Sequence, residues 1–232
     1  MIVKLENVEK VYYVGGYPIK ALDNVSLKIK EGEFLSIVGP SGSGKSTLLA
    51  IIGCLDRPTK GKVYLFGKDI SKLNDNQLSE FRRKYIGFIF QQYYLFSYLN
   101  ALENVQISLR ISGDSNLEKA RELLNKVGLG DRLYNYPNQL SGGQQQRVVI
   151  ARALAKDPKL ILADEPTANI DEKSANELLD ILKKLNEDEN RTIIIVTHNL
   201  RVAEKTNRIA VMRNGKILKD DATIDETIEL LK

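Results

Sequence analysis

The stretch Gly39-Pro-Ser-Gly-Ser-Gly-Lys45-Ser46 decides the fold class of this chain. It matches the pattern G-x-x-x-x-G-K-[ST] and lies between a predicted strand, Phe34 to Val38, and an apolar helix-like run, Leu48 to Ile52. In such a loop the glycines let backbone N–H groups curl around a polyphosphate, and the helix N-terminus adds its dipole. We therefore expect phosphate contacts from Gly39, Ser41, Gly42, Ser43, Gly44, Lys45, Ser46 and Thr47.

Two side chains of this loop carry specific chemistry. The Lys45 ammonium is expected to neutralise the β- and γ-phosphate oxygens, and the Ser46 hydroxyl to ligate Mg²⁺. The alternative is a glycine-rich turn that holds no ligand. We disfavour it because the motif has the strand and helix on either side that phosphate binding requires.

A second chemical feature is the apolar strand Leu160 to Ala163, which ends in the carboxylates Asp164 and Glu165. In proteins with this kind of loop such an aspartate holds the metal, and we expect Asp164 to do so. Glu165 would then polarise the attacking water as a general base, a role worth about 10²–10⁴ in rate. The alternative reading is a pair of solvated carboxylates at the edge of a sheet.

A third feature is Leu140-Ser-Gly-Gly-Gln144, which begins a predicted helix. Ser141 and Gln144 have the spacing of a capping box, which explains the helix start without any function. Gly142 and Gly143 lower helix propensity in the first turn and need another reason. We interpret them as room for a phosphate at the helix N-terminus.

The pattern along the chain indicates an α/β fold. Residues 1–30 alternate like strands, whereas spacing from Leu102 to about Ala155 is helical. The apolar runs Leu160 to Ala163 and Ile193 to Val196 flank a helical stripe of Leu178, Ile181, Leu182 and Leu185. Strand, helix, strand in this order predicts a parallel sheet with right-handed crossovers, interrupted by a helical block.

Composition excludes several classes of protein. The chain has 232 residues, of which 43% are apolar, and Cys54 is its only cysteine, so a disulfide scaffold is excluded. The apolar runs are far shorter than the roughly 20 residues of a spanning helix, and the first residues lack the core of a secretory signal. The net charge is +4, and residues 56–84 hold eight Lys/Arg against four Asp/Glu. This excess indicates either a solvated face or a surface near anionic lipid or an acidic partner. No basic run indicates nucleic-acid binding.

Together the three motifs resemble the ATP-binding cassette (ABC) ATPases of membrane transporters, over nearly the whole chain. The resemblance implies a P-loop core with a mixed, mainly parallel sheet, an N-terminal antiparallel β subdomain and an inserted α-helical subdomain. Residues 1–232 would form one nucleotide-binding domain, with the ATPase core at about 1–96 and 157–232 and the helical subdomain at about 97–156. ATP and Mg²⁺ are the implied cofactors.

The resemblance also implies roles for residues outside the three motifs. Gln91 resembles the glutamine that meets Mg²⁺ and the water, and His198 resembles the histidine at the γ-phosphate. Tyr12 resembles the aromatic residue on which adenine stacks, although the adjacent Tyr13 is a competitor. Asp171 resembles the D-loop aspartate of the family, and it could also cap the following helix. The catalytic set is thus Glu165, His198 and Gln91, and the metal set is Ser46, Gln91 and Asp164.

Within the family, Ile52 to Asp56, Tyr85 to Gln91 and Ala101 to Val105 are similar to the lipoprotein-release and macrolide-export branch. Departures from that branch are Ser97, Ile170 and Asn199, none of which removes a catalytic group. The resemblance implies export or extraction of a substrate through a separate membrane subunit. The alternative is an FtsE-like ATPase that drives a transmembrane signal without moving a solute. A soluble ABC ATPase of the repair type would need a coiled coil, for which there is no heptad run.

Two partners are expected. Phosphate-binding helix starts at Gly44 and Ser141 lie on either side of the helical block. In a two-fold dimer, each chain could therefore contact the ATP of the other chain. The contacting residues would be Ser141, Gly142, Gly143 and Gln144. A membrane permease is expected to dock near the loop aromatics Tyr93, Tyr94 and Phe96, because aromatic clusters in loops are typical of docking surfaces. Packing in the core is the alternative. The chain would lie peripherally on the cytoplasmic face of the cell membrane.

Overall fold

The computed structural model describes all 232 residues, with ten strands and eight α-helices. The strands are β1 (Val3–Val14), β2 (Tyr17–Ile29), β3 (Phe34–Val38), β4 (Lys60–Leu65), β5 (Lys68–Asp69), β6 (Ile86–Ile89), β7 (Leu160–Asp164), β8 (Thr192–Thr197), β9 (Arg208–Arg213) and β10 (Lys216–Lys219). The helices are α1 (Lys45–Ile52), α2 (Asp75–Tyr85), α3 (Ala101–Ser112), α4 (Leu117–Lys126), α5 (Gly142–Leu154), α6 (Glu172–Glu187), α7 (Leu200–Ala203) and α8 (Ile224–Leu231). No helix is both long and apolar enough to span a bilayer.

The strands form two sheets. The smaller sheet is antiparallel, in the order β2-β1-β4-β5, and it contains the predicted N-terminal strands. The larger sheet has the order β10-β9-β3-β8-β7-β6, in which only β10 runs antiparallel to its neighbour. The fold is therefore the predicted one, a mixed and mainly parallel sheet beside an antiparallel sheet.

Alternation along the central strands separates two cores. In β7, Leu160 and Leu162 join a core of 28 residues with α1 and the small sheet, whereas Ile161 and Ala163 join a core of 27 residues with the helices on the other face. Side chains of successive strand residues point to opposite faces, so a central strand covered on both sides is apolar throughout. This is why the apolar runs identified in the sequence contain no polar residue.

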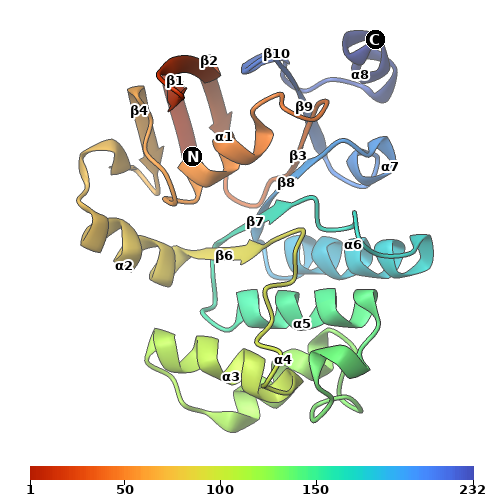
Figure 1. Ribbon diagram of the computed structural model, residues 1–232. Helices are drawn as coiled ribbons and strands as arrows, with labels where there is room; N and C mark the ends of the chain where they lie inside the picture. The colour runs from red at the N-terminus through yellow and green to blue at the C-terminus, as the bar shows by residue number, and fades with distance from the viewer.

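The helices α3, α4 and α5 follow one another between β6 and β7 and lie together beneath the large sheet (Figure 1). The helix α6 packs between α5 and β8, with the stripe residues Leu178, Leu182 and Leu185 buried as predicted. Because β3, β8 and β7 are parallel, their carboxyl ends lie at the same edge of the sheet. The loops after β3 and β7 therefore meet at that edge.

Residues 75–85 form the helix α2, which carries Phe81 and Tyr85, and β6 begins at Ile86. The signal for this helix is the Asn74–Gln77 capping box, in which each side chain accepts a hydrogen bond from the other residue's N–H. It is a weak signal because most of α2 is polar.

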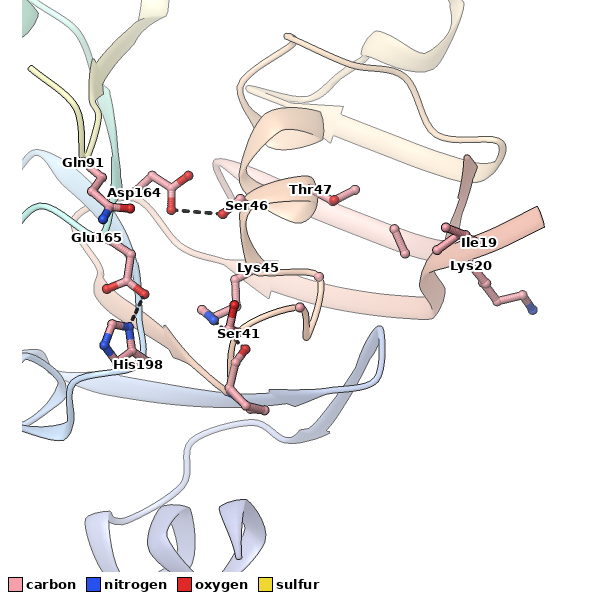
Figure 2. A pocket seen from close by; sticks show the side chains of 14 residues that line it. Ile19, Lys20, Ser41, Lys45, Ser46, Thr47, Gln91, Asp164, Glu165 and His198 are labelled. Atoms are coloured by element: carbon pink, nitrogen blue, oxygen red, sulfur yellow. Dashed lines mark hydrogen bonds and ion pairs between the residues drawn. The ribbon is translucent and has the colours of Figure 1, made fainter. Parts of the chain in front are cut away.

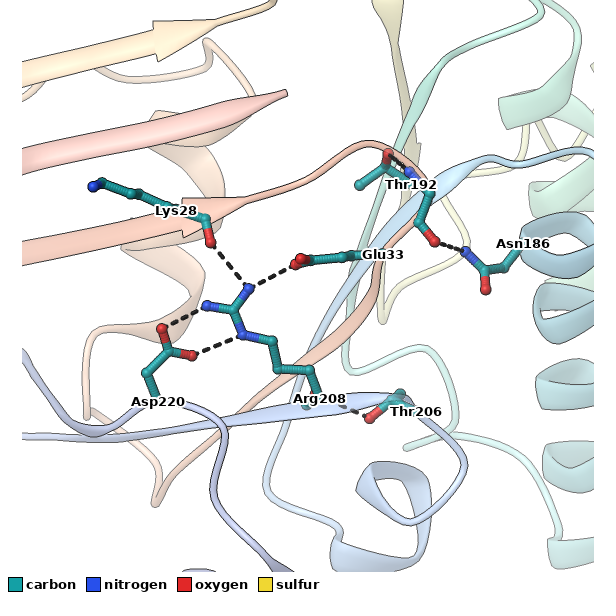
Figure 3. A network of polar contacts seen from close by, with 8 residues as sticks. Lys28, Glu33, Asn186, Thr192, Thr206, Arg208 and Asp220 are labelled. Atoms are coloured by element: carbon teal, nitrogen blue, oxygen red, sulfur yellow. Dashed lines mark hydrogen bonds and ion pairs between the residues drawn. The ribbon is translucent and has the colours of Figure 1, made fainter. Parts of the chain in front are cut away.

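A polar cluster around Arg208 joins the last strands to the rest of the molecule (Figure 3). The guanidinium donates two hydrogen bonds to Asp220, one to Glu33 at 2.6 Å and one to the Lys28 carbonyl at 3.0 Å. Lys28 lies on β2, Glu33 lies between β2 and β3, and Asp220 follows β10. The half-buried arginine thereby connects β9 with segments that are up to 180 residues away in sequence.

Candidate active site

A cavity of about 680 Å³ lies at the carboxyl ends of the central strands (Figure 2). It brings together residues from the glycine-rich loop, β7, β8 and the β1–β2 hairpin. The lining residues are Ile19, Lys20, Ala21, Pro40, Ser41, Gly42, Gly44, Lys45, Ser46, Thr47, Gln91, Asp164, Glu165 and His198. Ten of these residues were predicted as site residues from the sequence, and the other four are Ile19, Lys20, Ala21 and Pro40.

The glycine-rich loop has the backbone that phosphate binding requires. The residue that precedes α1, Gly44, has φ of 101°, and a Cβ there would lie 2.4 Å from the Ala21 carbonyl oxygen. At Gly39 a Cβ would lie 2.0 Å from the Met212 carbonyl oxygen. Only glycine fits either position, so the loop can pass beneath β2 and β9 and begin the helix in one step. Ser43 is buried, and its hydroxyl has no hydrogen-bond partner.

The Lys45 side chain is held across its own loop. Its ammonium donates to the carbonyl oxygens of Gly39 at 2.8 Å and Pro40 at 2.9 Å. Burial lowers the pKa of this ammonium, against the raising effect of Glu165 and Asp164. Because the ammonium is partly removed from water, it has lost part of its hydration. It is therefore placed to attract an anion that enters the loop.

Oxygen donors suitable for Mg²⁺ lie between α1 and β7. The Ser46 hydroxyl donates to Asp164 Oδ1 at 3.1 Å, and the Gln91 side chain lines the same part of the cavity. Burial raises the pKa of the Asp164 carboxyl, and Glu165 adds to this effect. A hydroxyl, a carboxylate and an amide are hard oxygen ligands, so these three residues fit Mg²⁺.

Glu165 is fixed by three contacts. Its Oε1 lies 2.7 Å from Nδ1 of His198, its Oε2 accepts from the Thr197 hydroxyl at 3.0 Å, and its N–H donates to the Val196 carbonyl at 2.9 Å. The backbone has φ of 45°, in the left-handed region that non-glycine residues seldom adopt. Thr197 was not identified from sequence, because a threonine at the end of a strand carries no signal of its own.

The helix start at Ser141 lies outside the cavity. The predicted capping box is present, because Ser141 Oγ accepts from the Gln144 N–H and Gln144 Oε1 accepts from the Ser141 N–H. Close packing within the chain also requires the two glycines. A Cβ on Gly143 would lie 2.6 Å from Ser174 on α6, and one on Gly142 would lie 2.8 Å from the Tyr93 hydroxyl.

Two further predicted residues also lie outside the cavity lining. Asp171 caps α6, since its carboxylate accepts from the N–H and the hydroxyl of Ser174. Tyr12 lies on β1 directly opposite Ile19 of β2, which does line the cavity. Its hydroxyl donates to Asp56 at 2.7 Å. Tyr13 is 74% exposed, compared with 36% for Tyr12.

The loop after Gln91 holds the aromatic cluster and corrects one expectation. Tyr94 and Phe96 are exposed as predicted, but Tyr93 is half-buried against the helical core, and its hydroxyl donates to the Asn169 carbonyl at 3.1 Å. Asn169 in turn donates to the Gln91 carbonyl at 3.0 Å. The reason is that the loop packs on the segment before α6, which the sequence alone does not place beside it.

The fold and this cavity, with its glycine-rich loop and two adjacent carboxylates at the end of β7, are those of a P-loop nucleoside-triphosphatase. The family model of the ABC transporter matches residues 22–168. The chain belongs to the ABC transporter family, in which it is an ATP-binding subunit with ATPase machinery.

Named relatives agree with this assignment. An uncharacterised ABC transporter ATP-binding protein of Thermotoga maritima is 51% identical, over 93% of each chain. The macrolide export ATP-binding/permease protein MacB of Hyphomonas neptunium is 48% identical over 94% of this chain, which spans 34% of that longer protein. The solved MJ0796 cassette, a dimer in a post-hydrolysis state with ADP and phosphate, is 49% identical, with a TM-score of 0.88 over 94% of this chain and 97% of that one.

Proposed function

We propose that two copies of this chain close around two MgATP and that hydrolysis drives a separate membrane subunit to export or extract a substrate. One observation carries the proposal. Lys45, Asp164 and Glu165 converge on one cavity, whereas the Ser141 helix start faces elsewhere in the same chain. A complete site then needs this second helix start from another copy, as two-fold symmetry provides.

The phosphate subsite uses the loop and its lysine. On binding, the Lys45 ammonium exchanges the two loop carbonyl oxygens for phosphate oxygens, which carry a full negative charge and bind it more strongly. Ser46, Asp164 and Gln91 would hold Mg²⁺, which supplies charge neutralisation at the phosphates. The N–H groups of the loop and the α1 dipole complete the subsite.

The hydrolytic group is Glu165. It accepts the proton of the attacking water while His198 and Thr197 hold its two carboxylate oxygens. His198 is the only histidine of the chain, and 65% of its side chain is exposed. It is therefore free to turn towards the terminal phosphate once a nucleotide and a partner chain cover it.

The second copy contributes Ser141, Gly142, Gly143 and Gln144 to the terminal phosphate, and Asp171 lies beside them at the interface. The solved MJ0796 cassettes, which are dimers, support this arrangement. The signature helix has free backbone N–H groups at its first turn, where an anion is favoured.

The membrane subunit is expected to dock on the exposed Tyr94 and Phe96, with Tyr93 supporting the loop from below. Arg152 of α5 donates to the carbonyl oxygens of both Tyr93 and Tyr94, so movement of the loop would be passed directly to the helical subdomain. The chain would then lie peripherally on the cytoplasmic side of the membrane. The MacB relatives, whose names describe export and which combine an ATP-binding part with a permease, favour export.

The Glu165→Gln variant tests the proposal. The glutamine amide cannot accept the proton of water, so hydrolysis is expected to fall by about 10²–10⁴ while ATP binding persists. Because Asp164 still holds the metal and the release step is blocked, the chain is expected to become a stable dimer with MgATP. Gel filtration with ATP, with ADP and without nucleotide measures this.

The matched control is Glu172→Gln, which removes an exposed carboxylate at the first turn of α6 and outside the phosphate cavity. It is expected to remain a monomer with ADP and to hydrolyse ATP normally. If Glu165→Gln stays monomeric with ATP, with ADP and without nucleotide, the proposal of a shared ATP site is wrong for this chain.

A further inference from the structure

Two residues, Asp56 and Lys10, hold the Tyr12 ring in one position at the edge of the phosphate cavity. The Tyr12 hydroxyl donates to Asp56 Oδ2 at 2.7 Å, and the Lys10 ammonium lies 4.8 Å from the ring centroid. Lys10 also donates to Asp56 Oδ1 at 2.6 Å and to the Arg57 carbonyl at 2.8 Å. The lysine and the carboxylate thus fix both the tip of the ring and one of its faces.

The Asp56 carboxylate is itself well anchored. Besides Lys10 and Tyr12, it accepts a hydrogen bond from the Arg57 N–H at 2.6 Å. Although burial opposes ionisation, the hydrogen bonds from Lys10, Tyr12 and the Arg57 N–H hold the pKa of this carboxyl below its usual value. Asp56 therefore accepts these hydrogen bonds as a carboxylate at neutral pH.

The position of the ring relates it to the cavity. Tyr12 and Ile19 are directly opposite on antiparallel strands, so their side chains lie on the same face of the small sheet. Ile19 and Thr47 both line the phosphate cavity (Figure 2). Tyr13 points to the opposite face and is paired with Pro18.

We propose that Asp56 and Lys10 are positioning residues that hold Tyr12 for stacking against the base of the nucleotide, with Ile19 as the apolar neighbour. This rests on the proposed nucleotide site and on the base stacking that the family resemblance implies for Tyr12, and it adds the two residues that hold the ring. Lys10 occupies one face of the ring, and the opposite face receives the base. Tyr13 has no such fixed contacts.

The subsite contains no group that reads the edge of a base. Tyr12 and Ile19 offer a ring face and an aliphatic side chain, and stacking tolerates any base. The contribution of Asp56 and Lys10 is to remove rotamer freedom from the tyrosine before the ligand arrives, which reduces the cost of binding. Their loss is therefore expected to weaken ligands with a base and to leave phosphate binding unchanged.

The test compares ADP with inorganic pyrophosphate by calorimetry, since neither is hydrolysed as ATP is. Asp56→Asn and Lys10→Met are each expected to weaken ADP binding about three- to tenfold, which is less than the full loss of one stacked base, and to leave pyrophosphate binding unchanged. Tyr12→Ala is expected to weaken ADP binding at least as much. Tyr13→Ala is the matched control and is expected to change neither ligand.

A double variant distinguishes positioning from other roles. Because Asp56 acts through the tyrosine, Asp56→Asn is expected to have no further effect on ADP binding in a Tyr12→Ala background. An equal further loss there, an unchanged ADP affinity in both single variants, or a parallel loss of pyrophosphate affinity overturns the proposal. If the unaltered protein binds neither ADP nor pyrophosphate, the nucleotide site itself is refuted. Melting curves verify that each variant is folded.

Discussion

At the scale of single residues, the chemistry depends on the placement of one carboxylate. The Glu165 backbone has an unfavourable positive φ, and its N–H bond to Val196 and the side-chain contacts of Thr197 and His198 maintain it. Thr197 is fully buried, and its hydroxyl also accepts from the Asn199 N–H, while its carbonyl accepts from the Gly39 N–H. One residue therefore connects the base, the histidine loop and the phosphate loop.

Replacing Thr197 with Val is expected to lower kcat about tenfold or more while KM for ATP is unchanged, because a hydrogen bond to a charged group is worth about 1.5–3 kcal/mol. Thr197→Ser retains the hydroxyl and is expected to restore kcat. Steady-state ATPase assays measure both constants.

The matched control for this prediction is Thr192→Val on the same strand, whose buried hydroxyl accepts from Gly32 and does not touch Glu165. It is expected to reduce stability and to leave kcat unchanged. Equal kcat losses in the two valine variants would show that the effect comes from the strand and not from the contact with Glu165.

At the scale of elements, the start of α5 combines three demands in four residues. The Ser141–Gln144 capping box satisfies the first N–H groups, Gly143 lets α5 approach α6, and Gly142 leaves room for Tyr93. A helix start that is both capped and closely packed is rigid. It can therefore present its positive end to a ligand on another molecule at little further entropic cost.

Ser141→Arg is expected to preserve ATP binding by the monomer and to abolish hydrolysis, because the larger side chain blocks the start of α5 for the neighbour's nucleotide. The Lys45→Ala variant, assayed by itself, is expected neither to bind nor to hydrolyse ATP. A mixture of the two variants can form one intact site, from the Lys45 loop of one chain and the Ser141 start of the other.

We expect ATPase activity to return in the mixture and to be highest when the two variants are present in nearly equal amounts. Each variant assayed by itself, at the same total concentration, serves as the control for contaminating activity. Activity that does not return at any ratio contradicts independent shared sites.

At the scale of the whole molecule, Arg208 connects elements that are far apart in sequence. Replacing it with Met keeps the apolar stem and removes the head group that joins Asp220, Glu33 and Lys28. Because Glu33 and Asp220 would lose a half-buried partner, the free energy of unfolding is expected to fall by about 1–2 kcal/mol. For a chain of this size the melting temperature would fall by about 2–8 °C.

The matched control is Arg201→Met, which breaks an ion pair with Glu172 whose two side chains are 74% and 75% exposed. Exposed pairs contribute little, so the expected change is within about 0.5 kcal/mol. Thermal melting measures both variants. Equal effects would show that the Arg208 network adds nothing beyond a surface pair.

The basic excess of residues 56–84 is also explained at this scale. Arg57 pairs with Asp75 and Lys60 with Glu9, and Arg82, Arg83 and Lys84 lie in the last turn of α2, where positive charge favours the helix end. These contacts favour the interpretation of a solvated face, the first of the two that the sequence left open.

The sequence by itself determined the local features whose signals lie within a few residues. The loop Gly39–Ser46, the strand ending in Asp164 and Glu165, the Ser141 capping box and the α6 stripe were all predicted, because backbone conformation and side-chain periodicity are local properties. The resemblance of these motifs to a family then supplied Gln91, His198 and Tyr12 as site residues. The polar helix α2 and the elements after β8 were missed, because their apolar spacing is short.

Only the tertiary structure decided which of these residues meet. It placed Thr197 on Glu165 and Asp56 on Tyr12, and it buried Tyr93 against Asn169, because pairs separated by 32, 44 and 76 residues are brought together by sheet order and packing. It also gave Gly143 a neighbour on α6. No local pattern encodes such contacts, since they depend on which faces the two cores cover once the central strands have paired.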